Sequence, residues 1–154
     1  MTIARLLEYP SAGCDVELPP DADPETARLL GDFAREIEGL STEQLEELYT
    51  RTFDINPVCS LEVGWQLFGE NYDRGSFLVW MRQQLRRFGL RESAELPDHL
   101  THALALYTRL EGEEARQFAS RFLCPAIDKM LAGFAGKNNP YENVLRAILQ
   151  GVEP

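Results

Sequence analysis

Residues 24–53 have the sequence PETARLLGDFAREIEGLSTEQLEELYTRTF, which carries two helical patterns in succession. In the first, apolar side chains recur every three or four residues from Ala27 to Ile37, the spacing of one face of an α-helix. Residues 41–44 then have the form of a capping box, in which the first and last side chains satisfy each other's exposed backbone N–H groups. The inward stripe of the second helix is expected to consist of Leu45, Leu48, Tyr49, Thr52 and Phe53. The stretch therefore predicts two α-helices, the first of which ends at Gly39.

The same spacing continues on both sides of this stretch. A short helix is predicted between Ile3 and Leu7. Further helices are predicted to begin at side chains that can accept a hydrogen bond from the first turn, namely Ser60, Asp73 and Asp98. The alternation of apolar and polar residues that is typical of a strand is absent from the sequence over any run of five or more residues.

The C-terminal third also has helical spacing. Its pattern from Glu113 to Phe134 is expected to kink or split at Pro125, because proline removes a backbone donor and clashes with the preceding turn. Residues 139–140 (NP) are expected to start the last helix. We therefore predict an all-α fold, a single-domain helical bundle of about six to eight helices over residues 1–154.

Charge and composition limit the kinds of partner that the protein can have. Its 15 basic and 25 acidic residues give a net charge of -10, which repels nucleic acid and anionic lipid and attracts a basic partner. Solubility alone would also explain this charge. No run of about 18 apolar residues and no export signal is seen, so the expected location is the cytoplasm, with no integral membrane segment.

Signatures of catalysis are missing from the sequence. The three cysteines, Cys14, Cys59 and Cys124, lie far apart and form no C-x-x-C pair, so we expect reduced thiols, with Cys59 and Cys124 buried. Phosphate-binding loops, dinucleotide-binding loops and nucleophile elbows are all absent. We predict that the protein is not an enzyme.

The two histidines leave weaker alternatives open. His99 and His102 are three residues apart on a predicted helix, which is half of a conceivable metal site. Helical di-metal sites need Glu-x-x-His motifs, and this chain has none. A nucleophilic pair of Cys59 with His99 has no supporting local motif. We therefore predict no metal ligand and no catalytic residue.

Polar turns and aromatic side chains alternate in the middle of the chain. Residues 69–75 (GENYDRG) are simplest to explain as a solvated turn in which Asp73 caps a helix. Trp80 lies beside, and not on, the inward stripe of its helix, where an aromatic ring could line a groove for a partner helix. Four arginines could meet phosphates, although a solvated basic face is the simpler interpretation: Arg82, Arg86, Arg87 and Arg91.

Five short stretches, in order and over nearly the whole chain, resemble one family. They are residues 6–10 (LLEYP), 48–54 (LYTRTFD), 59–61 (CSL), 69–75 (GENYDRG) and 95–100 (ELPDHL). Together they are similar to the nitrate reductase molybdenum cofactor assembly chaperones, the NarJ-like branch of the TorD/DmsD group of redox enzyme maturation proteins.

The resemblance implies an all-helical fold and a chaperone's role without catalysis. Such proteins bind the N-terminal segment of a molybdoenzyme catalytic subunit, often a twin-arginine signal or its remnant. They hold the subunit while molybdopterin guanine dinucleotide is inserted, before membrane attachment or export. The expected partner is thus this catalytic subunit and not nucleic acid. The chain itself is expected to bind no cofactor permanently and to be a monomer or a dimer.

Ten side chains are predicted to contact the client or to shape its groove. They are Tyr49, Phe53, Trp65, Phe68, Glu70, Asp73, Arg74, Trp80, Asp98 and His99. The resemblance implies that Asp98 and His99 serve peptide binding and that Arg74 holds the turn or faces the client. The remaining alternative for the whole protein is a helical structural subunit that stays bound in a redox enzyme complex, which would need a large apolar face.

Overall fold

The computed structural model describes residues 2–12 and 15–152, and every regular element in these ranges is helical. The α-helices are α1 (Pro24–Ile37), α2 (Thr42–Tyr49), α3 (Val63–Phe68), α4 (Tyr72–Arg87), α5 (Leu100–Tyr107), α6 (Gly112–Phe118), α7 (Cys124–Ala132) and α8 (Tyr141–Gln150). Two short 3₁₀-helices, η1 (Thr2–Leu7) and η3 (Pro57–Cys59), and two π-helical turns, η2 (Thr50–Asp54) and η4 (Ala119–Leu123), complete the set. The predicted all-α fold is confirmed.

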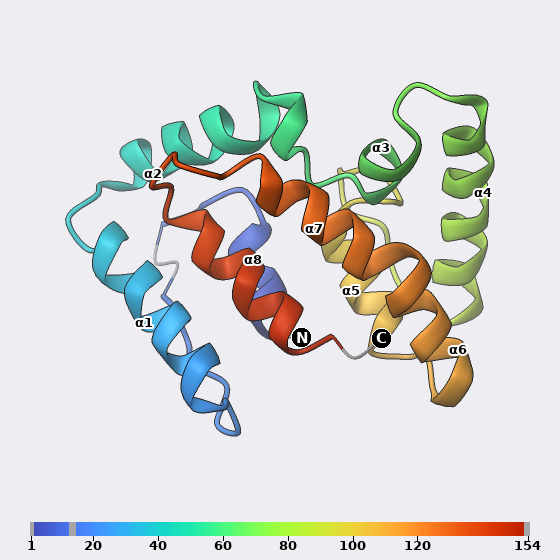
Figure 1. The fold of residues 1–154 in the computed structure, drawn as a ribbon, viewed down its shortest axis with the longest axis horizontal. Coiled ribbons are helices and arrows are strands. Elements are labelled where there is room, and N and C mark those ends of the chain that lie inside the picture. The colour runs from blue at the N-terminus through green and yellow to red at the C-terminus, as the bar shows by residue number, and fades with distance from the viewer. Residues whose placement is uncertain (1, 13–14, 153–154) are drawn as a thin grey trace.

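Five of the helices are arranged in a row that does not follow the chain order. Contacts join α1 to α8, α8 to α7, α7 to α3 and α3 to α4, so the last helix lies between the first and the seventh (Figure 1). Helix α5 packs against η1 and α4. The apolar stripes expected from the sequence face this interior, and Phe33, Met81 and Leu104 are among the fully buried side chains.

The helix starts around α1 and α2 agree with the sequence. Asp23 Oδ1 accepts a hydrogen bond from Thr26 N–H at 2.9 Å, and Pro24 occupies the first turn of α1. The capping box is present, because Gln44 N–H donates to Ser41 Oγ at 3.1 Å and Ser41 N–H donates to Gln44 Oε1 at 2.9 Å. Local capping rules therefore predict where α1 and α2 begin.

Two of the three other predicted caps are wrong by a few residues. Helix α3 begins at Val63, and Ser60 lies too far ahead to cap it; its Oγ accepts from Glu62 N–H at 3.3 Å instead. Helix α4 is capped by Asn71, whose Oδ1 accepts from the N–H of Asp73 at 3.1 Å. An asparagine side chain closes this tight turn two residues along the chain, which leaves Asp73 inside the first turn.

The predicted cap of α5 is wrong for a different reason. His99 caps this helix, with Nδ1 accepting from Thr101 N–H at 3.3 Å. Asp98 is directed away from the helix, and its carboxylate lies against the N–H of Gly64. The contact of Asp98 with Gly64, far along the chain, has therefore replaced the expected capping of α5 by Asp98.

Both π-helical turns continue an α-helix into the next segment. Ile55 N–H donates to Thr50 O at 3.0 Å at the end of η2. The second turn, η4, joins α6 to α7 directly ahead of Pro125, so the pattern is interrupted where the sequence predicts it. A widened turn accommodates the missing proline donor without ending the helix.

Of the two described cysteines, Cys59 is buried and Cys124 is half-buried, and both thiols are free, so the predicted burial holds fully only for Cys59. Burial raises the pKa of each thiol, which disfavours the reactive thiolate. Cys14 lies outside the described residues. Within residues 2–12 and 15–152, no helix is both long and apolar enough to cross a membrane.

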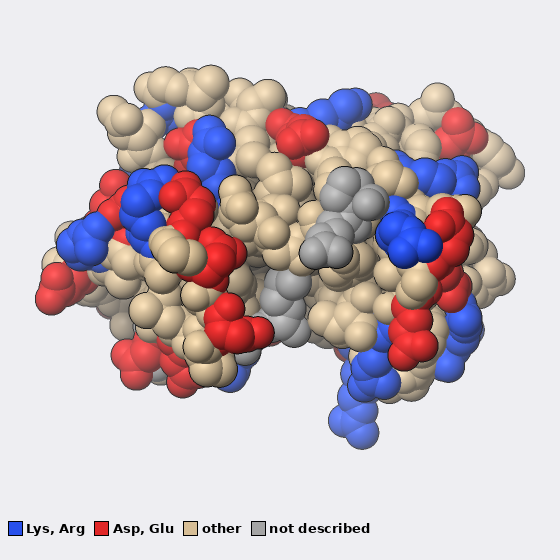
Figure 2. Space-filling view, turned by 60° about the horizontal axis from the view of Figure 1, so that its bottom comes forward, with Lys and Arg blue, Asp and Glu red and all other residues tan. Residues whose placement is uncertain are grey.

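Most arginines form ion pairs at the surface, and on the face drawn in Figure 2 basic side chains lie beside acidic ones. The paired arginines are Arg28, Arg35, Arg74, Arg82, Arg87, Arg116 and Arg146. Exposed pairs of this kind contribute little stability each, about 0–1 kcal/mol.

Candidate functional site

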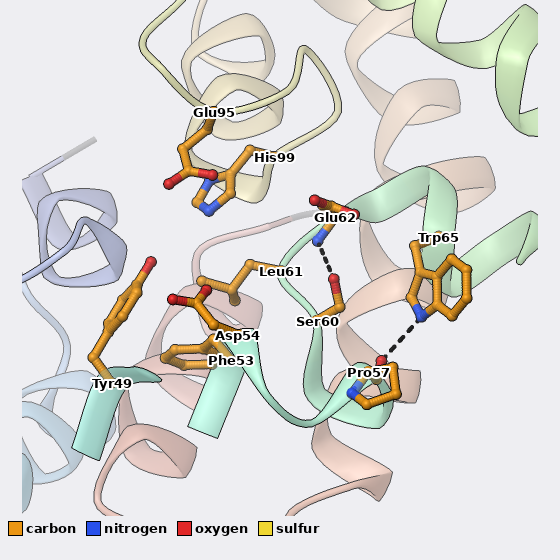
Figure 3. A pocket seen from close by; sticks show the side chains of 10 residues that line it. All are labelled: Tyr49, Phe53, Asp54, Pro57, Ser60, Leu61, Glu62, Trp65, Glu95 and His99. Carbon is orange, nitrogen blue, oxygen red and sulfur yellow. Dashed lines mark hydrogen bonds between the residues drawn. The ribbon is translucent and has the colours of Figure 1, made fainter. Parts of the chain in front are cut away.

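Two adjoining hollows lie where α2 and η2 meet the loop that precedes α5. The first has a volume of about 250 Å³ and is lined by Tyr49, Phe53, Asp54, Pro57, Ser60, Leu61, Glu62, Trp65, Glu95 and His99 (Figure 3). The second, of about 400 Å³, is lined by Glu8, Tyr9, Tyr49, Arg91, Ser93, Ala94, Glu95, His99, Thr101, His102 and Ala105. Because they share three lining residues, we treat them as one surface and call it the acidic groove.

Aromatic rings form the floor of the acidic groove. The Tyr49 hydroxyl donates a hydrogen bond to the backbone oxygen of Leu7 at 2.7 Å, and burial raises the pKa of this phenol. The Tyr49 and Phe53 rings meet edge to face with centroids 5.0 Å apart, and Tyr9 packs on the outer edge of Tyr49 at 5.6 Å. Such pairs hold one another's orientation, so the floor is apolar and rigid.

Carboxylates surround this floor. Asp54, Glu62 and Glu95 lie between the ring of Tyr49 and that of Trp65 (Figure 3), and Glu8 lines the second hollow. Among the described residues of the two linings, Arg91 is the only arginine or lysine. Glu62 is paired with Arg74 behind the wall, and the remaining three carboxylates against one guanidinium make the groove attractive to cationic groups.

A short backbone pairing fixes one wall of the groove. Val63 N–H donates to Asp98 O at 2.9 Å, and Leu100 N–H donates to Leu61 O at 2.7 Å, which makes an isolated antiparallel bridge between Glu62 and His99. The two side chains that line the wall are thereby positioned by the backbone. This contact joins segments that are far apart in the chain, and the helical spacing of the sequence contains no signal for it.

Asp98 lies behind this wall and has no exposed surface. Its Oδ2 accepts from Gly64 N–H at 2.9 Å and lies 3.5 Å from an Arg74 nitrogen, whereas Oδ1 has no hydrogen-bond partner among the described residues. Burial raises the pKa of Asp98, and Arg74 opposes that effect. A side chain at Gly64 would clash here, because a Cβ atom would lie 2.6 Å from Asp98 Oδ2.

Arg74 links the buried carboxylate to the groove. The same guanidinium nitrogen donates to Glu62 Oε2 at 2.7 Å, and the group lies 5.7 Å from the centre of the Trp65 ring. Trp65 in turn donates from Nε1 to Pro57 O at 3.0 Å. Arg74 thus holds the acidic and aromatic side chains of one wall from behind, and it occupies neither lining.

His99 faces the groove as a neutral ring. Its Nδ1 accepts from Thr101 N–H and also lies 2.8 Å from Thr101 Oγ1; with Nδ1 as the acceptor, the proton of the neutral ring is assigned to Nε2. Burial, and then the nearby His102, lower the pKa of His99 to about 4. His102 ties down the covering loop, because Ser93 N–H donates to its Nε2 at 2.9 Å and its Nδ1 lies 2.8 Å from Leu96 O.

The structure brings together only some of the predicted client-binding residues. Tyr49, Phe53, Trp65 and His99 line the acidic groove, whereas Arg74 and Asp98 lie behind its wall. Glu70 and Asp73 are exposed in the turn before α4 and line neither hollow. That any of these residues contacts a client stays a prediction.

Phe68 and Trp80 belong to a different cluster, next to η4. The Trp80 ring stacks on Phe77 at 5.9 Å and approaches Phe122 at 5.6 Å, and Phe68 lies 5.6 Å from Phe77. Their rings are half-buried among other aromatics, and a groove for a partner helix beside Trp80 stays a prediction. Packing thus accounts for their helical spacing.

Three carboxylates of the groove were not singled out from the sequence. Asp54 and Glu95 lie within two of the stretches that resemble the family, and Glu62 directly follows a third, but the resemblance there is carried by other residues. In a chain with 25 acidic residues, nothing in the local pattern separates these three from the rest. Cys59 and His99 line different hollows, and the described residues contain no group of three or more His, Cys, Asp or Glu suited to a metal ion.

Comparison of the sequence with known proteins identifies the family to which this all-helical chain belongs. The nitrate reductase delta subunit family matches residues 19–144, and the chain belongs to that family. It is also similar to the nitrate reductase molybdenum cofactor assembly chaperone NarJ of Escherichia coli, from strains K12 and O157:H7. Each is 31% identical over 123 residues, which cover 73% of this chain and 52% of the relative. The chain spans about half the length of these curated relatives. The resemblance seen in the sequence is confirmed.

Proposed function

We propose that the protein is an assembly chaperone for the catalytic subunit of a nitrate reductase-like molybdoenzyme, and that it binds the N-terminal segment of that subunit in the acidic groove. It would act in the cytoplasm, without catalysis and without a permanent cofactor, and hold the subunit until molybdopterin guanine dinucleotide is inserted. Membrane attachment or export would follow. Membership of the family and the similarity to NarJ support the client and the role.

The observation that carries the choice of site is the ring of carboxylates around an aromatic floor. Asp54 and Glu95 can pair with the basic side chains of a segment whose apolar residues lie on Tyr49 and Trp65, whereas Glu62 is already paired with Arg74. Segments that fold on binding gain affinity from apolar contacts and orientation from charged ones. The His99 Nε2–H adds a donor for a backbone oxygen of the segment.

Calorimetric titration with N-terminal peptides of the molybdoenzyme catalytic subunits from the same genome tests the proposal. We expect one peptide to bind with micromolar or tighter affinity. Trp65→Ala should weaken it, and Asp54→Asn with Glu95→Gln should weaken it by about tenfold, since each 1.4 kcal/mol is a factor of ten.

A matched control removes the same charge elsewhere. Glu43→Gln with Glu47→Gln alters two exposed carboxylates of α2 that line neither hollow, and it should leave affinity unchanged. An equal loss of affinity in both double variants would mean that the net charge of the protein, and not the acidic groove, attracts the peptide. If no peptide binds and the purified chain self-associates, a permanently bound structural subunit becomes the better explanation.

A further inference from the structure

A second cavity lies on another face of η2, away from the acidic groove. It has a volume of about 560 Å³ and is formed by the end of α1, by the segment from α2 to η3, and by the connection between α7 and α8. That connection runs beside α2 and η2 (Figure 1). Leu48 and Thr52 face this cavity, whereas Tyr49 and Phe53 face the acidic groove. We call it the basic cavity.

Two cations from distant parts of the chain meet at the basic cavity. Arg51 comes from η2 and Lys137 from the connection before α8. Neither forms an ion pair or a hydrogen bond with another described side chain, although seven other arginines of this acidic protein are paired. Arg51 and Lys137 thus place two unpaired cations at one hollow of a chain with ten more acidic than basic residues.

The carboxylate in this lining does not neutralise the pair. Glu36 also lines the cavity, and its Oε2 accepts from Asn143 Nδ2 at 3.3 Å. Two cations against one carboxylate leave a local excess of positive charge. Because the net charge of -10 repels anions elsewhere, an anion that binds this protein would be drawn to a specific site and not to its general field.

Hydrogen bonds hold the two sides of the basic cavity in register. Asn139 Nδ2 donates to Thr52 Oγ1 at 2.7 Å, and Thr52 Oγ1 donates to Leu48 O at 2.6 Å. Asn139 Oδ1 accepts from the N–H of Tyr141, and the next N–H groups of α8 are also engaged. Contacts to an anion would therefore come from the Arg51 and Lys137 side chains and not from the start of α8.

We infer that the basic cavity binds a phosphorylated small molecule. A planar guanidinium and an ammonium group are the usual partners of phosphate oxygens. The volume is in the range of small-molecule sites, roughly 300–1,000 Å³. Leu48, Phe134 and Pro140 provide an apolar wall for the organic part of the ligand. This site is separate from the proposed peptide groove and does not depend on it.

Calorimetric titration of the purified chain with inorganic pyrophosphate and with ATP, in magnesium-free buffer, tests the inference. Both probes should bind the wild-type protein. Arg51→Ala with Lys137→Ala should weaken each by about tenfold or more, as expected for the loss of two charge-assisted contacts. Both side chains are exposed, so the variant should keep its fold, which circular dichroism checks.

A control of equal charge is available in Arg5→Ala with Arg109→Ala, two exposed arginines outside every ion pair in the described residues. This variant should bind both probes like the wild type, and so should Trp65→Ala in the acidic groove. The inference is overturned if neither probe binds at millimolar concentration, if the control loses as much affinity as the cavity variant, or if citrate binds as tightly as pyrophosphate.

Discussion

A fully buried carboxylate such as Asp98 is costly, and it is retained here by three contacts that all concern the groove wall. It accepts from Gly64 N–H, lies against Arg74, and belongs to the segment that pairs with Leu61 and Val63. Since Arg74 also contacts Glu62 and Trp65, Asp98 supports this wall of the acidic groove from behind.

Removal of this carboxylate should therefore affect folding first. Asp98→Ala leaves the Gly64 N–H without a partner in the interior, which should lower the free energy of unfolding by about 1–3 kcal/mol. Urea denaturation measures the change. Asp73→Ala removes an exposed carboxylate in the first turn of α4, next to Arg74, and should stay within about 0.5 kcal/mol of the wild type. An unchanged midpoint for Asp98→Ala would mean that the wall does not depend on it.

His99 should make stability depend on pH. Its pKa is about 4 in the fold against 6.5 for the free side chain, so the unfolded chain takes up a proton between these values that the folded protein does not. Stability should thus fall as pH drops from about 6.5 to 4, by an amount on the order of 3 kcal/mol in full. Asp98, whose pKa is raised, acts in the opposite sense.

Urea midpoints recorded across this pH range check the effect. In His99→Gln, a neutral side chain occupies the same position, and the midpoint should vary less between pH 6.5 and pH 4. A parallel decline in both proteins would assign the acid sensitivity to other groups, among them the paired carboxylates of the surface.

At the scale of single elements, the sequence is most informative where a helix depends on its own residues. The capping box before α2 and the interruption at Pro125, in the first turn of α7, follow from local chemistry, and both are found. The start of α5 is different, because Asp98 is drawn to Gly64 and His99 takes its place as the cap. Such exchanges depend on a partner far along the chain, so spacing alone cannot predict them.

The same limit applies to the groove. Tyr49 and Phe53 are recognisable from the sequence because they share a helical stripe and a family motif. The Glu62–His99 bridge that sets Glu62 beside them is a long-range contact. Phe68 and Trp80 have the same helical spacing but pack against Phe77 in a separate cluster. The spacing of an aromatic ring does not show whether it packs in a cluster or lines a groove.

Two glycines in neighbouring helices give a matched test of this packing. A Cβ at Gly64 would lie 2.6 Å from Asp98 Oδ2 and 3.3 Å from an Arg74 carbon, so Gly64→Ala should destabilise the fold by about 1–3 kcal/mol. A Cβ at Gly75 in α4 meets nothing within 4 Å, and Gly75→Ala should stabilise by up to about 1 kcal/mol. Thermal unfolding compares the two, and the same sign for both would show that Gly64 is not a packing constraint.

On the scale of the whole molecule, the net charge acts on the rate of encounter more than on the strength of the final contact. The acidic groove is one part of a strongly negative surface, so a basic segment should be attracted from a distance. The association rate of the client peptide should fall steeply between low salt and physiological salt, and the dissociation rate should change little.

Stopped-flow fluorescence of Trp65 and Trp80 can follow this reaction at several ionic strengths. Neutral sucrose at matched viscosity serves as the control for slower diffusion. If most of the salt dependence were found in the dissociation rate, ion pairs formed within the bound complex would be the better explanation.

The backbone bridge between Glu62 and His99 also determines when the acidic groove can form during synthesis of the chain. The groove needs Leu7 beneath its floor, the residues around His99 in its wall, and Tyr141 behind Phe53, whose rings lie 5.0 Å apart. A nascent chain that has been synthesised only to its middle would contain Tyr49 and Phe53. It would still lack the residues around His99 and Tyr141 that complete the groove. The groove can therefore form only after the chain has been synthesised at least as far as Tyr141.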